Sequence, residues 1–371
     1  MATSAARDRY QMTHHFHGGT TVQQTASVQR TASVVDDISN WLSISADELD
    51  RGVQGALREQ VLDRVRELNL RAAAGDPDAF LQQQQILARI YDLGLRIAPG
   101  EPSAEGSVVI HEIARLVESA TGAAEDARIE AGLLDDMPSE PAAYVSWLKA
   151  LAKQHRVYKH PYYTDFISNF ADAEDLRLYM IQESVIDARF DDLLALMQVG
   201  TDGPAKMEIA ANYWDEMGNG RPDEVHTTLF RRIFEVFDVR EDEVADRLTG
   251  TALLSGNLAV MLSRYRYRYA EAVGYLGMTE WLVPDRFVCV VRAWERLGLP
   301  EVGITYHRLH ITVDSQHAAG WFHNVVKPAA TSEAMRIGIA RGTLWRLNSS
   351  ARYLDERLAE TRPRWADGSR R

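Results

Sequence analysis

Three residues near the C-terminal end of the chain, His310, Asp314 and His317, combine metal-binding side chains with the spacing of one helix face. Their order is His-x3-Asp-x2-His, and at ~100° of rotation per residue these positions fall within a narrow arc. Two imidazoles and one carboxylate therefore point the same way from one rigid element. Apolar neighbours such as Leu309 and Ile311 predict that this helix is largely buried, which favours a metal site over a polar surface face.

Further carboxylate and imidazole side chains upstream extend this candidate site. Glu216 and His226 stand on either side of a Gly-Asn-Gly turn at 218–220, which is expected to fold the following helix back toward the same interior. Glu280 lies 30 residues before His310. Taken alone, Glu280 also fits the start of a turn, so its value as a candidate comes from the downstream triad.

Glu183 is a fourth acidic candidate, on a predicted helix at 174–198, close to an otherwise apolar stripe. A buried carboxylate without a cation is costly, which favours a ligand role over a structural one. Two other carboxylates compete, because Asp187 has a position similar to that of Glu183 and Glu208 a position similar to that of Glu216. Helical phase alone excludes neither.

The type of metal follows from the balance of these donors. The set contains four carboxylates and three imidazoles: Glu183, Glu216, Glu280, Asp314, His226, His310 and His317. Four negative charges equal the charge of two ferrous ions. Zinc sites rarely gather so many carboxylates and magnesium sites seldom use three imidazoles, so the residues predict two Fe2+ ions inside a helical bundle.

Composition limits the class of protein. The 371 residues include 41 basic and 53 acidic side chains, a net charge of −12, which argues against nucleic acid or an anionic membrane as a partner. The single cysteine, Cys289, excludes an intrachain disulfide framework and any thiolate-rich metal site. No stretch approaches the ~20 apolar residues of a membrane span, and the N-terminus lacks a signal-peptide pattern, so we expect a cytoplasmic protein.

Apolar periodicity predicts an all-α chain in three parts. Residues 1–34 are polar and lack a sustained apolar period, which indicates a disordered or mobile arm, and 35–135 form an accessory or dimerisation region. All candidate ligands fall in the third part, 136–362. The helices are expected at about 35–50, 54–73, 77–96, 108–120, 140–154, 161–170, 174–198, 202–217, 222–237, 252–274, 285–297, 300–325 and 329–360.

These residues resemble the haem-oxygenase-like diiron oxidases and oxygenases, whose fold is a seven-helix bundle. The resemblance covers roughly 140–330 and rests on the acidic turn between Asp215 and His226, on Glu280, and on the His-x3-Asp-x2-His triad. It implies a haem-oxygenase-like bundle with an N-terminal helical extension. The residues that would bind two irons are Glu216, His226, Glu280, His310, Asp314 and His317. Members of the N-oxygenating branch carry one more carboxylate on a preceding helix, which Glu183 would match; some relatives space the first Glu and His more closely than this chain does.

The resemblance also implies an activity. Two Fe2+ ions with O2 as co-substrate would oxidise a small amine- or amino-acid-like metabolite, and a seven-ligand set favours N-oxygenation in secondary metabolism. The alternatives are desaturation or C–C cleavage of an amino or fatty acid, and a metal-free helical binding protein of the same fold. The expected partners are a small-molecule substrate, an external electron donor and a second copy of the chain. The Arg-Tyr alternation at 264–269 either supplies an arginine for a substrate carboxylate or packs tyrosines between helices.

Overall fold

The computed structural model describes residues 33–366, and this part of the chain contains helices and no strand. The prediction of an all-α fold is confirmed, whereas the arm predicted at 1–34 lies outside the described residues except for its last two. The N-terminal helices are α1 (Val34–Leu42), α2 (Ala46–Gly52), α3 (Gly55–Ala73), α4 (Pro77–Leu95) and α5 (Val108–Asp126).

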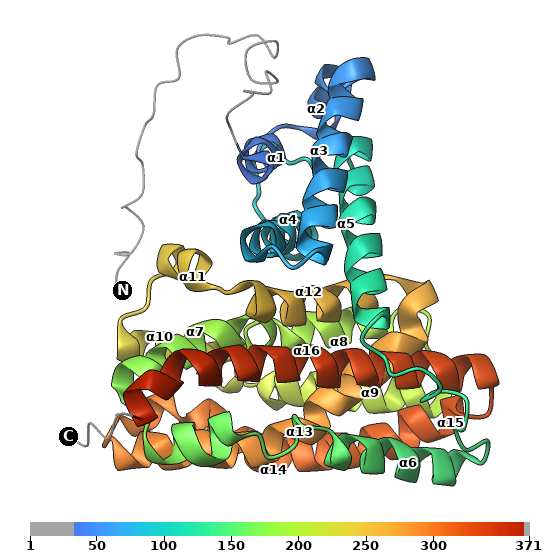
Figure 1. The fold of residues 1–371 in the computed structure, drawn as a ribbon. Coiled ribbons are helices and arrows are strands. Elements are labelled where there is room, and N and C mark those ends of the chain that lie inside the picture. Colours follow the sequence, from blue (N-terminus) through green and yellow to red (C-terminus); the bar gives the residue numbers. More distant parts are fainter. Residues whose placement is uncertain (1–32, 367–371) are drawn as a thin grey trace, which may run out of the picture.

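The remaining helices form an elongated bundle below this N-terminal group (Figure 1). Its α-helices are α6 (Pro141–Gln154), α7 (Ala173–Asp187), α8 (Phe190–Gln198), α9 (Gly203–Glu216), α10 (His226–Phe237), α11 (Glu241–Arg247), α12 (Gly250–Arg264), α13 (Tyr269–Arg296), α14 (Thr305–Trp321), α15 (Lys327–Ala329) and α16 (Glu333–Ala366). Short 3-10 segments are η2 (Gly218–Gly220), η3 (Pro222–Glu224), η4 (Arg266–Arg268) and η5 (Glu301–Gly303), and π-helical segments are η1 (Tyr162–Ile167) and η6 (Phe322–Val326).

The N-terminal helices begin where the sequence offers capping side chains. Asp76 accepts hydrogen bonds from the first amides of α4, and Ser107 accepts one from the amide of Ile110 in α5. Each of these two helices turns an apolar stripe inward, where residues such as Val117 and Ile86 are fully buried. The helices at 54–73 and 77–96 predicted from this periodicity are confirmed to within one residue.

Polar contacts join the N-terminal group to the bundle. Glu118 of α5 accepts hydrogen bonds from the hydroxyls of Tyr91 (2.9 Å) and Tyr265 (3.1 Å), and Tyr265 belongs to the segment that follows α12. Asn257 of α12 donates to the backbone carbonyl of Gln84 in α4 at 2.8 Å. These contacts support the structural interpretation of the Arg-Tyr alternation, since one of its tyrosines packs between helices of the two groups.

Two long helices, α13 and α16, form the centre of the bundle and approach each other closely. A Cβ atom at Gly274 would lie 2.0 Å from the carbonyl oxygen of Ile339, and one at Gly342 would lie 1.9 Å from that of Glu271. Only glycine permits this approach of the two backbones. None of the helices in residues 33–366 combines the length and apolar character needed to span a membrane.

The predicted break before residue 285 is wrong, because α13 continues through Pro284. Proline removes one hydrogen bond inside a helix and usually kinks or ends it. Burial of α13 against α14 and α16 outweighs this local cost, so Glu280 stands in the middle of a helix and not at a turn. The predicted helix 252–274 is in turn divided, since Tyr265 is extended (φ −106°, ψ 120°) and ends α12.

Candidate metal centre

A tight turn between α9 and α10 positions the first two candidate ligands. Glu216 is the last residue of α9 and His226 the first of α10. Between them Gly218, Asn219 and Gly220 all have positive φ, at 59°, 53° and 85°. A Cβ atom on Gly218 would lie 2.5 Å from the backbone of the segment that returns to α10, so the fold of this turn requires glycine.

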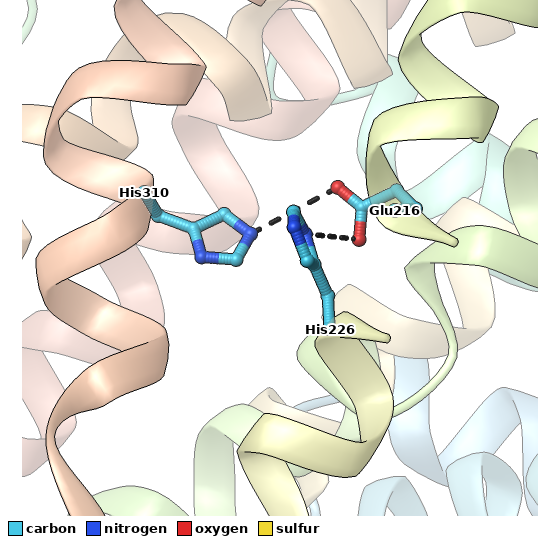
Figure 2. Close-up of side chains that lie close together, drawn as sticks. All are labelled: Glu216, His226 and His310. Carbon is cyan, nitrogen blue, oxygen red and sulfur yellow. Dashed lines mark ion pairs between the residues drawn. The ribbon is translucent and has the colours of Figure 1, made fainter. Parts of the chain in front are cut away.

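Glu216, His226 and His310 point toward one another from three different helices (Figure 2). Nδ1 of His226 lies 2.8 Å from one carboxylate oxygen of Glu216, and Nε2 of His310 lies 3.8 Å from the other. All three side chains are buried. Burial of Glu216 favours its neutral form, but the two histidines outweigh this effect and lower its pKa to about 2. The carboxylate is therefore ready to bind a cation at neutral pH.

The orientation of His310 leaves one ring nitrogen free for a metal. Its Nδ1–H donates a hydrogen bond to the backbone carbonyl of Tyr306, one turn earlier in α14, at 2.8 Å. The Tyr306 ring also packs against the imidazole, with 4.0 Å between ring centroids. The tautomer with a proton on Nδ1 leaves a lone pair on Nε2, the nitrogen that faces Glu216.

Glu280, Asp314 and His317 form a second buried cluster, which joins α13 to α14. Nδ1 of His317 lies 3.7 Å from a carboxylate oxygen of Glu280 and 3.9 Å from one of Asp314. In each cluster one donor atom per residue lies within 4.8 Å of the other two. His310 and Asp314 are one turn apart on α14, a rise of about 6 Å, so the two clusters are neighbours.

The electrostatics of the second cluster also suit a bound cation. Burial raises the pKa of Asp314 well above its usual range, and the carboxylates of Glu280, Glu216 and Asp187 raise it further. Burial disfavours protonation of His317, yet the carboxylates of Glu280 and Asp215 outweigh it and raise the pKa of the imidazole to about 9. Buried carboxylates so close together are stabilised when metal ions share their charge.

Several buried donor atoms of the two clusters lack hydrogen-bond partners, which also suits bound metal ions. Among the described residues, the buried atoms Nδ1 of His226, Nδ1 of His317 and Oε1 of Glu280 have no hydrogen-bond partner. The contact between His226 and Glu216 is short but lacks hydrogen-bond geometry. Buried polar atoms are rarely left unpaired, and these atoms belong to the donor clusters. The residues therefore fit two metal ions, one in each cluster.

Asp215 is a further candidate site residue, which the sequence did not single out as a ligand. Its carboxylate accepts a hydrogen bond from Nε2–H of His317 at 3.0 Å, while its side chain remains 41% exposed. A carboxylate that holds the second nitrogen of a metal-binding histidine fixes the ring and its tautomer. The sequence offered one signal for it, its position directly before Glu216. It could not predict the contact with His317, because that contact depends on how the helices are oriented.

The structure brings six of the seven predicted ligands into the two clusters and places Glu183 outside both. Glu183 instead lies near the guanidinium groups of Arg286 and Arg346, which oppose the rise in pKa that its burial causes. Asp187, one turn further along α7, faces the clusters and raises the pKa of Asp314. Its buried Oδ2 has no hydrogen-bond partner among the described residues.

The second alternative, Glu208, is also outside the clusters. Its carboxylate accepts a hydrogen bond from Nδ2 of Asn324 at 2.5 Å. The structure therefore brings Glu216, and not Glu208, to His226 and His310.

A helical bundle that encloses two buried carboxylate–histidine clusters is typical of metal-binding bundle proteins. Residues 177–351 match the sequence model of a haem-oxygenase-like family described as iron-containing redox enzymes. The matched region contains every candidate ligand described above. The resemblance inferred from the sequence is thus confirmed at the level of this family, and the match supports a general oxidoreductase role. No curated protein matches it.

Proposed function

We propose that this protein is an O2-dependent non-haem diiron oxygenase or oxidase that acts on a small amine- or amino-acid-like metabolite, by N-oxygenation. One observation carries the proposal: α14 contributes His310 to the first donor cluster and Asp314 and His317 to the second. Two adjacent sites on one helix suit a pair of metal ions that act on the same molecule. Family membership supports iron as the metal.

In this proposal each cluster holds one iron. The first ion is bound by Glu216, His226 and His310, and the second by Glu280, Asp314 and His317. We propose Asp187, in preference to Glu183, as the additional carboxylate ligand. Its buried Oδ2 has no hydrogen-bond partner among the described residues, and its carboxylate raises the pKa of Asp314 in the second cluster.

The four carboxylates assigned to the metals match the charge of two ferrous ions. Those carboxylates belong to Asp187, Glu216, Glu280 and Asp314. Few protein charges are then left unbalanced at the centre, as its burial requires.

The protein's own residues orient the ligands and exclude water. When bound, two ferrous ions supply the electrons that reduce O2. Asp215 and the Tyr306 carbonyl hold the second ring nitrogens of His317 and His310. The rings of Phe287 and Tyr306 pack beside His310, with centroid distances of 6.1 and 4.0 Å, and keep this side of the centre apolar.

Turnover would also require partners. We expect an external electron donor to return the irons to the ferrous state and the N-terminal helices to support a homodimer. Desaturation and C–C cleavage would use the same ligands, so product analysis distinguishes them from N-oxygenation. A metal-free binding protein is disfavoured by the unpartnered donor atoms of Glu280 and His317.

Anaerobic loading with Fe(II) tests the proposal, with iron per chain quantified and absorbance followed after mixing with O2. We expect about two irons per chain, as the two clusters require, and a transient visible band that amine substrates accelerate. His310→Ala should lose iron, whereas His323→Ala, which changes an exposed histidine on η6, should not. No uptake by the wild type, or one iron without a response to O2, would refute the diiron assignment.

A further inference from the structure

A small cavity lies beside the proposed iron centre, between α7, α12, α13 and α16. Its volume is about 20 Å3, which is above the ~10–15 Å3 that a single water molecule needs and suits a small polar group. Arg286, Arg346, Glu183 and Tyr353 are among the residues that line it. Of these residues, Glu183 is partly exposed to solvent.

The two arginines of this cavity are unusual because they are buried without an ion pair. Arg286 is 7% exposed and Arg346 is 5% exposed, and neither has a carboxylate oxygen within 4.0 Å among the described residues. Arg286 donates to Ser350 Oγ at 2.9 Å, and Arg346 donates through Nε to Thr279 Oγ1 at 2.9 Å. A guanidinium group has five N–H donors, so these bonds leave capacity for an anion.

A third polar group in the cavity is also incompletely satisfied. The hydroxyl of Tyr353 is buried and has no hydrogen-bond partner among the described residues. It lies near Glu183 but outside hydrogen-bonding geometry. Buried hydroxyls normally find a partner, so this one indicates a polar ligand or a water molecule in the cavity.

The charges of the cavity do not balance once the metals are counted. This step depends on the proposed function, in which Asp187 gives its charge to iron. Glu183 then remains as the carboxylate facing two guanidinium groups, and one positive charge is left over. A buried excess charge is costly unless a counter-ion is present.

Residues that line or support the cavity are also close in sequence to the proposed iron ligands. Thr279, which holds Arg346, directly precedes the proposed ligand Glu280. Glu183, on the other wall, is one helical turn from Asp187.

We infer that this cavity binds the carboxylate of a small substrate, with Arg286 and Arg346 as its charged partners. Paired guanidinium groups recognise planar carboxylates well, and one carboxylate supplies the single negative charge that is lacking. Because the cavity is small, only the carboxylate head group of the substrate enters it. The substrate class is therefore a carboxylic acid, such as an amino acid, in preference to a simple amine.

The test compares propionate with propionamide, two probes of similar size that differ in charge. Dissociation constants are measured by ligand-observed NMR at fixed ionic strength on the protein loaded with Zn(II), so that Asp187 is engaged at the centre as the charge argument requires. Propionate that binds the metal itself would still be bound by the arginine variants, which distinguishes it from propionate bound in the cavity. We expect propionate to bind about tenfold more tightly, as a charge-assisted hydrogen bond provides. Arg286→Met and Arg346→Met should remove this preference. Arg357→Met should retain it, because Arg357 is buried in α16 but ion-paired with Glu360.

Equal binding of both probes by the wild type, or a preference that survives in Arg286→Met and Arg346→Met, would overturn the inference. If either methionine variant does not fold, Arg286→Lys is measured in its place. It keeps the charge but loses the planar fork, so the preference should weaken without disappearing. Iron content is determined separately for each protein. A wild type that discriminates the probes but takes up no iron would refute the proposed function and leave the carboxylate site standing.

Discussion

Asp215 is a partly exposed residue that contacts His317 of the second donor cluster. If it positions His317, Asp215→Asn should weaken iron binding at that cluster by ~10- to 100-fold, because loss of such a partner has this effect in other metal sites. The asparagine can still accept a hydrogen bond but lacks the charge. Competition with a coloured chelator measures the affinity of each site. Asp223→Asn, on the exposed segment η3, is the control and should leave both affinities unchanged.

An unchanged second-site affinity in Asp215→Asn would show that His317 keeps its orientation through packing alone. Iron at the first cluster gives an internal reference, since His310 is held by the Tyr306 carbonyl and not by Asp215.

His307 makes stability depend on pH. It is fully buried, and neither ring nitrogen has a hydrogen-bond partner among the described residues. Burial lowers the pKa of His307 to about 3, and the neighbouring His310 adds to the effect. The unfolded chain takes up a proton near pH 6.5, so the contribution of neutral His307 is complete above that pH and is lost as pH falls toward 3.

His307→Leu should therefore flatten the acid limb of the stability curve. Below pH 6.5 the free energy of unfolding of the wild type should fall by up to about 1.4 kcal/mol per pH unit relative to the variant. Urea unfolding of both metal-free proteins from pH 8 to pH 4.5 measures the difference. Parallel curves over that range would contradict a neutral buried His307.

Among the elements, the turn between α9 and α10 has the most stringent backbone requirement. Gly218→Ala should destabilise the fold by about 3 kcal/mol or more, since the new Cβ overlaps the backbone at Glu224 as well as straining φ. Gly298→Ala is the matched control, with φ 64° but nothing within 4 Å, and should cost about 1 kcal/mol. Chemical unfolding and iron content per chain are the measurements. Equal costs at the two sites would show that the turn adapts.

Sequence periodicity located most helices because an apolar stripe repeats at the helical period wherever a helix packs on a core. It also found the spacing on α14, since residues on one helix keep fixed relative directions. It failed at Pro284, because packing of α13 outweighs the tendency of proline to end a helix. It could not choose between Glu183 and Asp187, which lie one turn apart. The fold separates them, because Asp187, and not Glu183, is among the carboxylates that raise the pKa of Asp314.

At the scale of the whole molecule, bound iron should stabilise the fold. The two clusters join α9, α10, α13 and α14, so the ions bind the folded chain and not the unfolded one. At a free iron concentration of about a thousand dissociation constants, one site adds ~4 kcal/mol. We expect a chelator to lower the melting temperature under anaerobic conditions and added Fe(II) to restore it. A melting temperature that ignores iron would indicate that these clusters do not bind it.

The docking of the N-terminal helices on the bundle could not be predicted from the sequence. The hydrogen bond between Tyr265 and Glu118 joins residues 147 positions apart, and no local pattern specifies such a pair. The assignment of 35–135 as a dimerisation region stays a prediction.

One helix, α14, carries donors for both clusters, so metal binding at one cluster should favour binding at the other. An ion in the first cluster fixes the axial position and rotation of α14 through His310. Asp314 and His317 are then already placed for the next ion, which loses less conformational entropy on binding. Iron should accordingly enter as a pair, with a steep saturation curve and few singly loaded chains.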